Sequence, residues 1–334
     1  MMIPGPAVRS VSGGSARIRG RDLMEAIVGK HADSTAEQER VEQQRGEKPQ
    51  RGPRPAWVRL IVLLVLSVVA DGVIGSIYSG VQSNAVALLI VGVLVGPLLA
   101  WLVLLGYAKM VRVLERRQAG EVGRPGAVAE VRRGTLLGIG LFAVTIAIIA
   151  VFGGYGIHGW GNLAAAIGAF GMTCAVAVVE EVMFRGVLFR IVEEKTGTWG
   201  AMAVSAIVFG ALHLINSGAT LYGAVSIAIE GGLMLAAAYT LTRTLWLPIG
   251  LHLGWNFAEG GIFGTNVSGS SDHTLGLFKS SVSGSSLLSG GSFGPEASII
   301  ALLVCGTTTV LLLRRARRRG QIRRRKASAA PTPA

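Results

Sequence analysis

Two adjacent glutamates, Glu180 and Glu181, follow the apolar run 175–179, and Arg185 comes four residues after Glu181. An ionisable side chain inside a membrane costs several kcal/mol and by default indicates a function with a partner close by. On a helix, Glu181 and Arg185 share a face and can form an ion pair. Glu180 is turned by about 100° from Glu181, so it needs a partner from another segment. By themselves, these residues could also form a purely structural ion pair.

Two histidines lie in later apolar runs. His213 follows Phe209 by four residues, and on its own it is best interpreted as a core histidine with a satisfied ring. His252 and Asn256 are also four apart and share a helix face, a pattern typical of interhelical hydrogen bonds. We count depth from the cytoplasmic end of each predicted span, at about 1.5 Å per residue. Glu180 and His213 then lie roughly 15–22 Å deep, and His252 and Asn256 roughly 9–15 Å deep. We therefore expect the four polar side chains to converge at one site.

The helices that must position these residues are membrane helices. Of the 334 residues, 51% are apolar and only 15% charged, and the mean hydropathy is +0.53. A soluble domain has about 25% charged residues, and the apolar runs are long enough to cross a hydrocarbon core of about 30 Å. We predict an all-α, multi-pass transmembrane helical bundle with about eight spans. The predicted spans are 57–78, 84–108, 134–153, 162–191, 198–216, 221–241, 246–263 and 297–313.

Most of the basic residues behind the net charge of +13 lie in the tails and in every second loop. This is the distribution of cytoplasmic loops under the positive-inside rule, so we expect both termini in the cytoplasm and no binding of nucleic acid. The pairs Gly92–Gly96 and Gly134–Gly138 have the spacing that lets membrane helices approach closely.

Composition divides the chain into five parts. They are a disordered cytoplasmic tail (1–56), three transmembrane helices (57–153), a core of four helices (160–263), a Gly/Ser-rich outer loop that is either a flexible linker or a lid (264–296), and a last transmembrane helix with a basic tail (297–334).

Three motifs occur in a fixed order on successive helices: Glu-Glu-x-x-x-Arg at 180–185, Phe-x-x-x-His at 209–213 and His-x-x-x-Asn at 252–256. Together they resemble the CPBP family of intramembrane peptidases, which includes the CaaX prenyl proteases and the bacterial Abi proteins. The segment 245–252, Leu-Trp-Leu-Pro-Ile-Gly-Leu-His, also resembles the start of the family's last motif helix. The resemblance covers about residues 160–263.

This resemblance implies a peptidase whose catalytic residues are Glu180, Glu181, Arg185, His213, His252 and Asn256. In that scheme Glu180 and His213 activate a water, and His252 and Asn256 hold the oxyanion of the tetrahedral intermediate. Glu181 and Arg185 fix the helix. We expect no metal and no cofactor, although Glu180, His213 and His252 could instead bind zinc as two imidazoles and a carboxylate. The family has been described both as metalloproteases and as glutamate-dependent proteases.

The expected substrates are membrane proteins or lipidated peptides, including CaaX-type prenylated ones, and the lipid bilayer is the other partner. The Abi-like resemblance points to the cell membrane of a bacterium. Two other functions stay open. Buried glutamates and histidines also build transporters and proton relays, and the chain could be a non-catalytic scaffold of the bacteriocin-immunity kind.

Overall fold

The computed structural model describes residues 52–270 and 276–325. This part of the chain is largely helical and contains one two-stranded antiparallel sheet. The predicted tail 1–56 therefore lies almost entirely outside the described residues. The first elements are α2 (Ala56–Val81), α3 (Ala85–Ile90), the π-helical η1 (Val91–Val95), α4 (Gly96–Glu115), the 3-10 turn η2 (Gly120–Val122) and α5 (Ala127–Val151).

The middle of the chain begins with a strand. Its elements are β1 (Tyr155–Trp160), α6 (Leu163–Glu181), the π-helical η3 (Val182–Phe189), α7 (Arg190–Leu212) and the 3-10 turn η4 (His213–Ile215). The remaining elements are α8 (Leu221–Ile227), the π-helical η5 (Ala228–Leu233), α9 (Met234–Thr242), α10 (Trp246–Asn256), the π-helical η6 (Phe257–Ile262), β2 (Phe278–Val282), α11 (Ser286–Ser289), the 3-10 turn η7 (Pro295–Ala297) and α12 (Ile299–Arg318).

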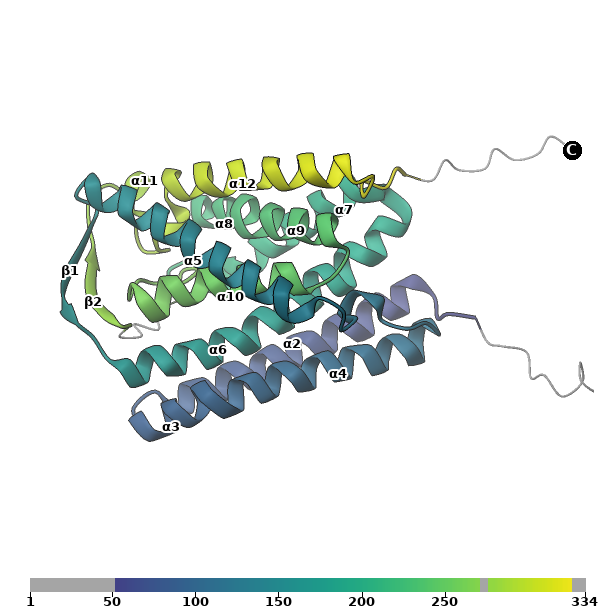
Figure 1. Cartoon of the computed structure of the whole chain (residues 1–334), viewed down its shortest axis with the longest axis horizontal. Coiled ribbons are helices and arrows are strands. Elements are labelled where there is room, and N and C mark those ends of the chain that lie inside the picture. Colours follow the sequence, from purple (N-terminus) through teal and green to yellow (C-terminus); the bar gives the residue numbers. More distant parts are fainter. Residues whose placement is uncertain (1–51, 271–275, 326–334) are drawn as a thin grey trace, which may run out of the picture. The chain divides into compact units, whose positions relative to one another are not determined.

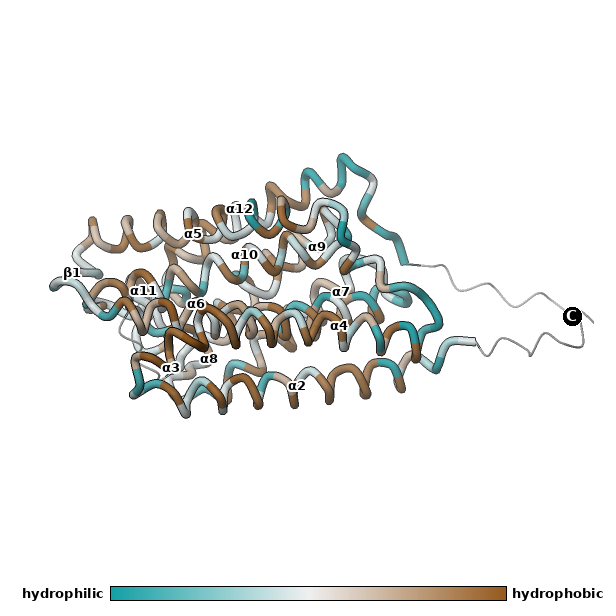
Figure 2. Tube along the Cα trace, turned by 60° about the horizontal axis from the view of Figure 1, so that its bottom comes forward, coloured by the Kyte–Doolittle hydropathy of each residue, from teal (hydrophilic) through white to brown (hydrophobic). Residues whose placement is uncertain are grey.

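The described chain contains six helices that are long and apolar enough to cross a membrane, and they include Ala56–Val81, Leu163–Ile215 and Ile299–Arg318. Apolar residues cover most of their length, whereas hydrophilic residues gather at the end where the chain enters α2 and leaves α12 (Figure 2). The chain is thus an integral membrane protein built of helices, as the sequence predicts.

The count of six differs from the predicted eight for two reasons. The predicted spans 162–191 and 198–216 run into one helical stretch, interrupted at Gly197, whose φ of 73° is outside the helical region. The predicted span 246–263 corresponds to α10 and η6, of 11 and 6 residues, which follow each other directly and together lie at the short end of the range for a membrane span. The number of crossings therefore depends on how such helix joins and short helices are counted.

Glycines bring the site-bearing helices into backbone contact. A Cβ at Gly138 of α5 would overlap the carbonyl of Leu251, and a Cβ at Gly254 of α10 would overlap that of Thr135. Gly96 packs in the same way against Gly171 of α6. Both predicted small-residue pairs are therefore real packing positions. They hold α10 against α5 and α6 against α4, which fixes the helices that carry the polar residues (Figure 1).

The Gly/Ser-rich outer loop is more ordered than its composition suggests. β2 pairs antiparallel with β1, with Tyr155 opposite Val282, and the Tyr155 hydroxyl donates to the carbonyl of Phe263 at 2.9 Å. Further on, the ring of Phe293 is fully buried. Of the two expected alternatives, a flexible linker does not describe residues 276–297, because backbone pairing and one aromatic anchor supply the order that the small side chains do not. The alternative of a lid stays a prediction. The two strands are also a small departure from the all-α prediction.

At the hydrophilic end of the bundle, charged residues pair with each other. Glu115 accepts from Arg190 and from Arg117, the latter at 2.7 Å. Burial alone would raise the pKa of Glu121, but hydrogen bonds from Arg117 and Tyr107 outweigh it and leave that pKa below its ordinary value. This network ties α4 and the following loop to the start of α7.

Candidate active site

Glu181 and Arg185 form the predicted ion pair where α6 passes into η3. Arg185 Nη1 donates to Glu181 Oε1 at 2.7 Å, and both side chains are fully buried. The other terminal nitrogen of Arg185 donates to the carbonyls of Gly231 and Gly232 at 2.8 and 3.1 Å. The guanidinium also lies 5.1 Å from the ring centre of Phe209. Arg185 therefore joins the first motif helix to η5 and α7.

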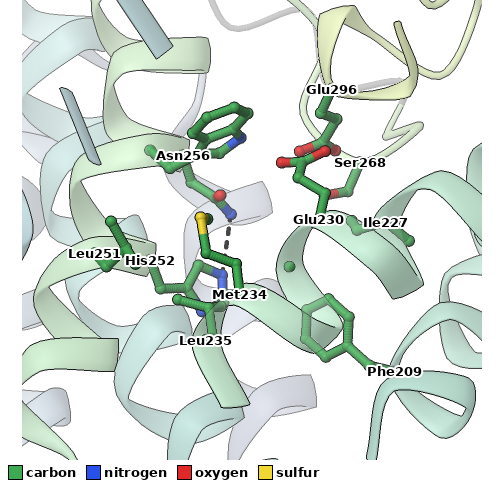
Figure 3. Close-up of a pocket in the computed structure, with 12 residues that line it drawn as sticks. Phe209, Ile227, Glu230, Met234, Leu235, Leu251, His252, Asn256, Ser268 and Glu296 are labelled. Carbon is green, nitrogen blue, oxygen red and sulfur yellow. Dashed lines mark hydrogen bonds between the residues drawn. The ribbon is translucent and has the colours of Figure 1, made fainter. Parts of the chain in front are cut away.

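His252 lies between the two glutamates. Its Nδ1 is 3.0 Å from Glu181 Oε1, and its Nε2 is 3.9 Å from Glu180 Oε2. Asn256, one turn later on α10, places its amide nitrogen 3.3 Å from the same Nε2, as the dashed line in Figure 3 shows. A neutral ring that donates from Nδ1 to Glu181 accepts from Asn256 at Nε2. Glu181 is thus bound by Arg185 and His252 together, a contact that the spacing on one helix could not reveal.

His213 is the first residue after α7. Its Nδ1 lies 2.7 Å from the carbonyl of Phe209, so Nδ1 donates and Nε2 stays available as an acceptor. The ring packs at 4.7 Å from that of Phe209. The second motif therefore uses Phe209 twice, once through its carbonyl to fix the imidazole and once through its ring to cover Arg185.

A cavity of about 260 Å³ joins these groups. Glu180, His213 and Asn256 all line it, together with Asp71 of α2 and Ser268 of the outer loop. One oxygen of Glu180, Oε2, is buried and has no hydrogen-bond partner among the described residues. The structure thus brings Glu180, His213 and Asn256 to one cavity. His252 contacts Asn256, and the Glu181–Arg185 pair in turn contacts the imidazole of His252.

Asp71 is a cavity residue that sequence reasoning missed. It is half-buried on α2, which the prediction treated only as an apolar span. The signal was available, because Asp71 is the one acidic residue in the 26-residue helix Ala56–Val81, and an acidic residue at membrane depth indicates function.

Three more buried glutamates were also missed: Glu230, Glu259 and Glu296 are each at most 2% exposed. Figure 3 shows the carboxyl groups of Glu230 and Glu296 directed toward one another, across from His252 and Asn256. A cavity of only about 20 Å³ is lined by these two glutamates on one side and by His252 and Asn256 on the other. Burial raises the pKa of Glu296, which lies in the outer loop. Glu230 and Glu259 each begin a Glu-Gly-Gly triplet in a π-helical segment, a repeat that the sequence displays.

The zinc alternative can be compared with the side-chain arrangement. Within residues 52–270 and 276–325, no group of three His, Cys, Asp or Glu side chains is arranged to hold a metal ion. His252 Nδ1 contacts Glu181 and His213 Nδ1 contacts a backbone carbonyl. Such contacts are also the usual second partners of a metal-binding imidazole, so zinc binding by Glu180, His213 and His252 stays a prediction.

Comparison with known proteins agrees with the motif order. Residues 162–258 match the family model described as type II CAAX prenyl endopeptidase Rce1-like. The chain is also similar to a protein of Bacillus subtilis (strain 168) named "Putative membrane peptidase YdiL", with 33% identity over 79 residues. That alignment covers 24% of this chain and 30% of the relative, so the chain matches less than a third of the relative's length. No solved structure matches the chain significantly.

The matched segment 162–258 begins just before α6 and includes every residue of the three motifs. It excludes α2 and the outer loop, which complete the cavity wall. The resemblance expected from the motifs is thus confirmed, and the helices that carry Glu180, His213 and His252 match the Rce1-like family of type II CAAX prenyl endopeptidases.

Proposed function

We propose that this protein is an intramembrane endopeptidase that hydrolyses peptide bonds of membrane-associated substrates with a water activated by Glu180. One observation carries the proposal. Glu180 lines a cavity together with His213 and Asn256, and its Oε2 has no hydrogen-bond partner among the described residues, so a water placed in the cavity can contact a base and an amide donor at once.

In the proposed reaction, Glu180 takes a proton from the water while the water oxygen attacks the peptide carbonyl carbon. The carbonyl oxygen becomes an oxyanion, and an N–H of Asn256 stabilises it. The same proton then passes from Glu180 to the leaving nitrogen, the C–N bond breaks, and a carboxylic acid and an amine result. Nε2 of His213 accepts a hydrogen bond from the water and orients it.

Glu181, Arg185 and His252 act in this scheme by positioning. The Arg185–Glu181 pair fixes the carboxylate that receives His252 Nδ1. His252 in turn holds one N–H of Asn256, which leaves the other for the oxyanion. A protonated His252 would itself be a second donor to the oxyanion.

The reaction is proposed to be metal-free, and the substrates to be membrane proteins or lipidated peptides, CaaX-type prenylated ones among them. The cell membrane of a bacterium, with both termini in the cytoplasm, is the proposed location. The basic ends of the described chain support this orientation.

The test is cleavage of a library of membrane-tethered peptides by the purified protein, with Glu180→Gln as the variant and Glu194→Gln as the control. Glu194 is a half-exposed member of the charged network at the hydrophilic end. We expect cleavage by the wild type and the control and none by Glu180→Gln. A zinc chelator in the same assay should leave the rate unchanged, and a loss of activity that added zinc restores would contradict the metal-free reaction.

The buried glutamates 230, 259 and 296 favour a second candidate function, proton or ion transport, because carboxyl groups inside a bundle also form ion paths. Ion flux into liposomes in the absence of any cleavage would favour transport. A scaffold without catalysis predicts neither cleavage nor flux.

A further inference from the structure

Asp71 lies near enough to His252 for a charge–charge interaction. No hydrogen bond or ion pair joins its carboxyl group to another residue among 52–270 and 276–325, although Arg59 on the same helix is paired with Glu115 and Glu194. An acidic side chain at membrane depth normally has a counter-charge or a polar contact. Since the half-buried Asp71 lines the candidate catalytic cavity, its carboxyl group is available to a polar or charged group that enters the cavity.

The charged side chains that line the cavity around Asp71 are acidic. Among the described residues, its lining contains two carboxyl groups, those of Asp71 and Glu180, and no lysine or arginine. The nearest cation of the motif helices, Arg185, is fully buried and bound to Glu181 and two carbonyls, so it cannot turn toward the cavity. Charges act over longer distances and more strongly in a low-dielectric cleft than in water. An entering cation is therefore attracted, and an entering anion is repelled.

Asp71 and the catalytic groups lie on different walls. Glu180 comes from α6, His213 from the end of α7 and Asn256 from α10, whereas Asp71 comes from α2. A peptide whose scissile bond lies between Glu180 and Asn256 must pass α2 with an adjacent side chain. Asp71 also lies outside the family-matched residues 162–258.

We propose that Asp71 is a specificity-determining residue that selects substrates with a lysine or arginine side chain within a few residues of the scissile bond. It disfavours substrates with a carboxylate at the same place. This inference rests on the proposed peptidase function. Asp71 would attract a substrate lysine or arginine and repel a substrate carboxylate. Specific sites commonly combine an attractive and a repulsive contact in this way.

The test uses three membrane-tethered peptides that differ only in one residue beside the scissile bond: Lys, Gln or Glu. The full-length protein should cleave the Lys peptide with a kcat/KM on the order of tenfold above that of the Gln peptide, and the Glu peptide more slowly still. In Asp71→Asn, the Lys-to-Gln ratio should fall to about one. Asp71→Glu should restore the preference, and Ser79→Asn, an exposed position on the same helix, should keep it.

Binding of the same three peptides, labelled with a fluorophore and measured by anisotropy, separates the two proposals. Equal cleavage of all three peptides, or an unchanged ratio in Asp71→Asn, overturns the role of Asp71 and leaves the peptidase function standing. Lys-selective binding that Asp71→Asn abolishes, without cleavage of any peptide, supports Asp71 and overturns the peptidase function. If the protein shows no cleavage and no selective binding, both proposals are overturned. A melting temperature within a few degrees of the wild type shows that the variant is folded.

Discussion

At the scale of single residues, the site is a chain of contacts around one carboxylate. Glu181 Oε1 receives Arg185 Nη1 at 2.7 Å and His252 Nδ1 at 3.0 Å. A buried charge that loses its partner is strongly destabilising, whereas the intact pair adds little over an apolar replacement. Glu181 is therefore a structural centre, and Glu180, which lines the cavity, is the proposed reactive carboxylate.

Arg185→Met should destabilise the folded protein by about 3–5 kcal/mol, because it removes the cationic partner of the buried Glu181 and the side-chain donor to two carbonyls. The double variant Glu181→Gln/Arg185→Met should lose less stability than the sum of the two single variants, since it removes both charges. Thermal unfolding in detergent measures both quantities. Strict additivity would show that the pair is not coupled.

Asn256→Ala should lower kcat by about 10²–10³-fold with little change in KM, because an oxyanion donor acts mainly in the transition state. Asn256→Asp should be at least as damaging, since it places a carboxylate where negative charge develops. Steady-state kinetics on a cleaved peptide measure both effects. A kcat within threefold of the wild type for Asn256→Ala would exclude this residue as an oxyanion donor.

The sequence predicted part of this site, and the missed part has a physical cause. Spacing on one helix predicted the Glu181–Arg185 pair, because positions i and i+4 always meet. The Glu181–His252 contact joins residues 71 positions apart, and local periodicity does not encode it. Asp71 was missed because its helix otherwise has the composition of an ordinary membrane span.

At the scale of elements, close glycine contacts and π-helical segments position the site. The π-helical η3 directly follows Glu181, and η6 directly follows Asn256. The π-helical η5 contains Glu230. Such segments are rare and concentrate at functional sites. The glycine spacing was visible in the sequence, whereas the π-helical geometry was not, because it depends on packing between helices.

Gly138→Leu should strongly destabilise the protein and abolish activity, because its side chain would overlap the backbone of α10 at Leu251 and displace His252. Gly140→Leu on the same helix is the matched control. A Cβ there meets nothing within 4 Å, so this variant should keep its stability and activity. Melting temperature and peptide cleavage test the pair, and equal behaviour of the two variants would refute the packing argument.

At the scale of the whole molecule, hydropathy and charge predicted a helical membrane protein. They did not predict the number of membrane crossings or the order of the outer loop. Span counts rest on uninterrupted apolar length, whereas a non-helical glycine, Gly197, joins two predicted spans into one helical stretch and the span at α10 and η6 is short. The order of residues 276–297 comes from pairing with β1 and from the buried Phe293. Composition could not reveal either feature.

The proposed orientation places β2 outside and the end of α12 in the cytoplasm. Lys279→Cys, exposed on β2, should react with a membrane-impermeant maleimide in intact cells. Arg318→Cys, exposed at the end of α12, should react only after lysis. Labelling of native Cys174 and Cys305 in the unmodified protein is the background control. The reverse pattern would invert the orientation.

The central claim is that Glu180 activates the hydrolytic water. Its most direct test is the cleavage rate of Glu180→Gln relative to the wild type on a membrane-tethered peptide, at equal amounts of folded protein. The amide keeps the size of the side chain but cannot accept the proton, so the account predicts a rate at least about 10³-fold lower, within the range expected for loss of a catalytic base. A Glu180→Gln rate equal to that of the wild type would contradict it.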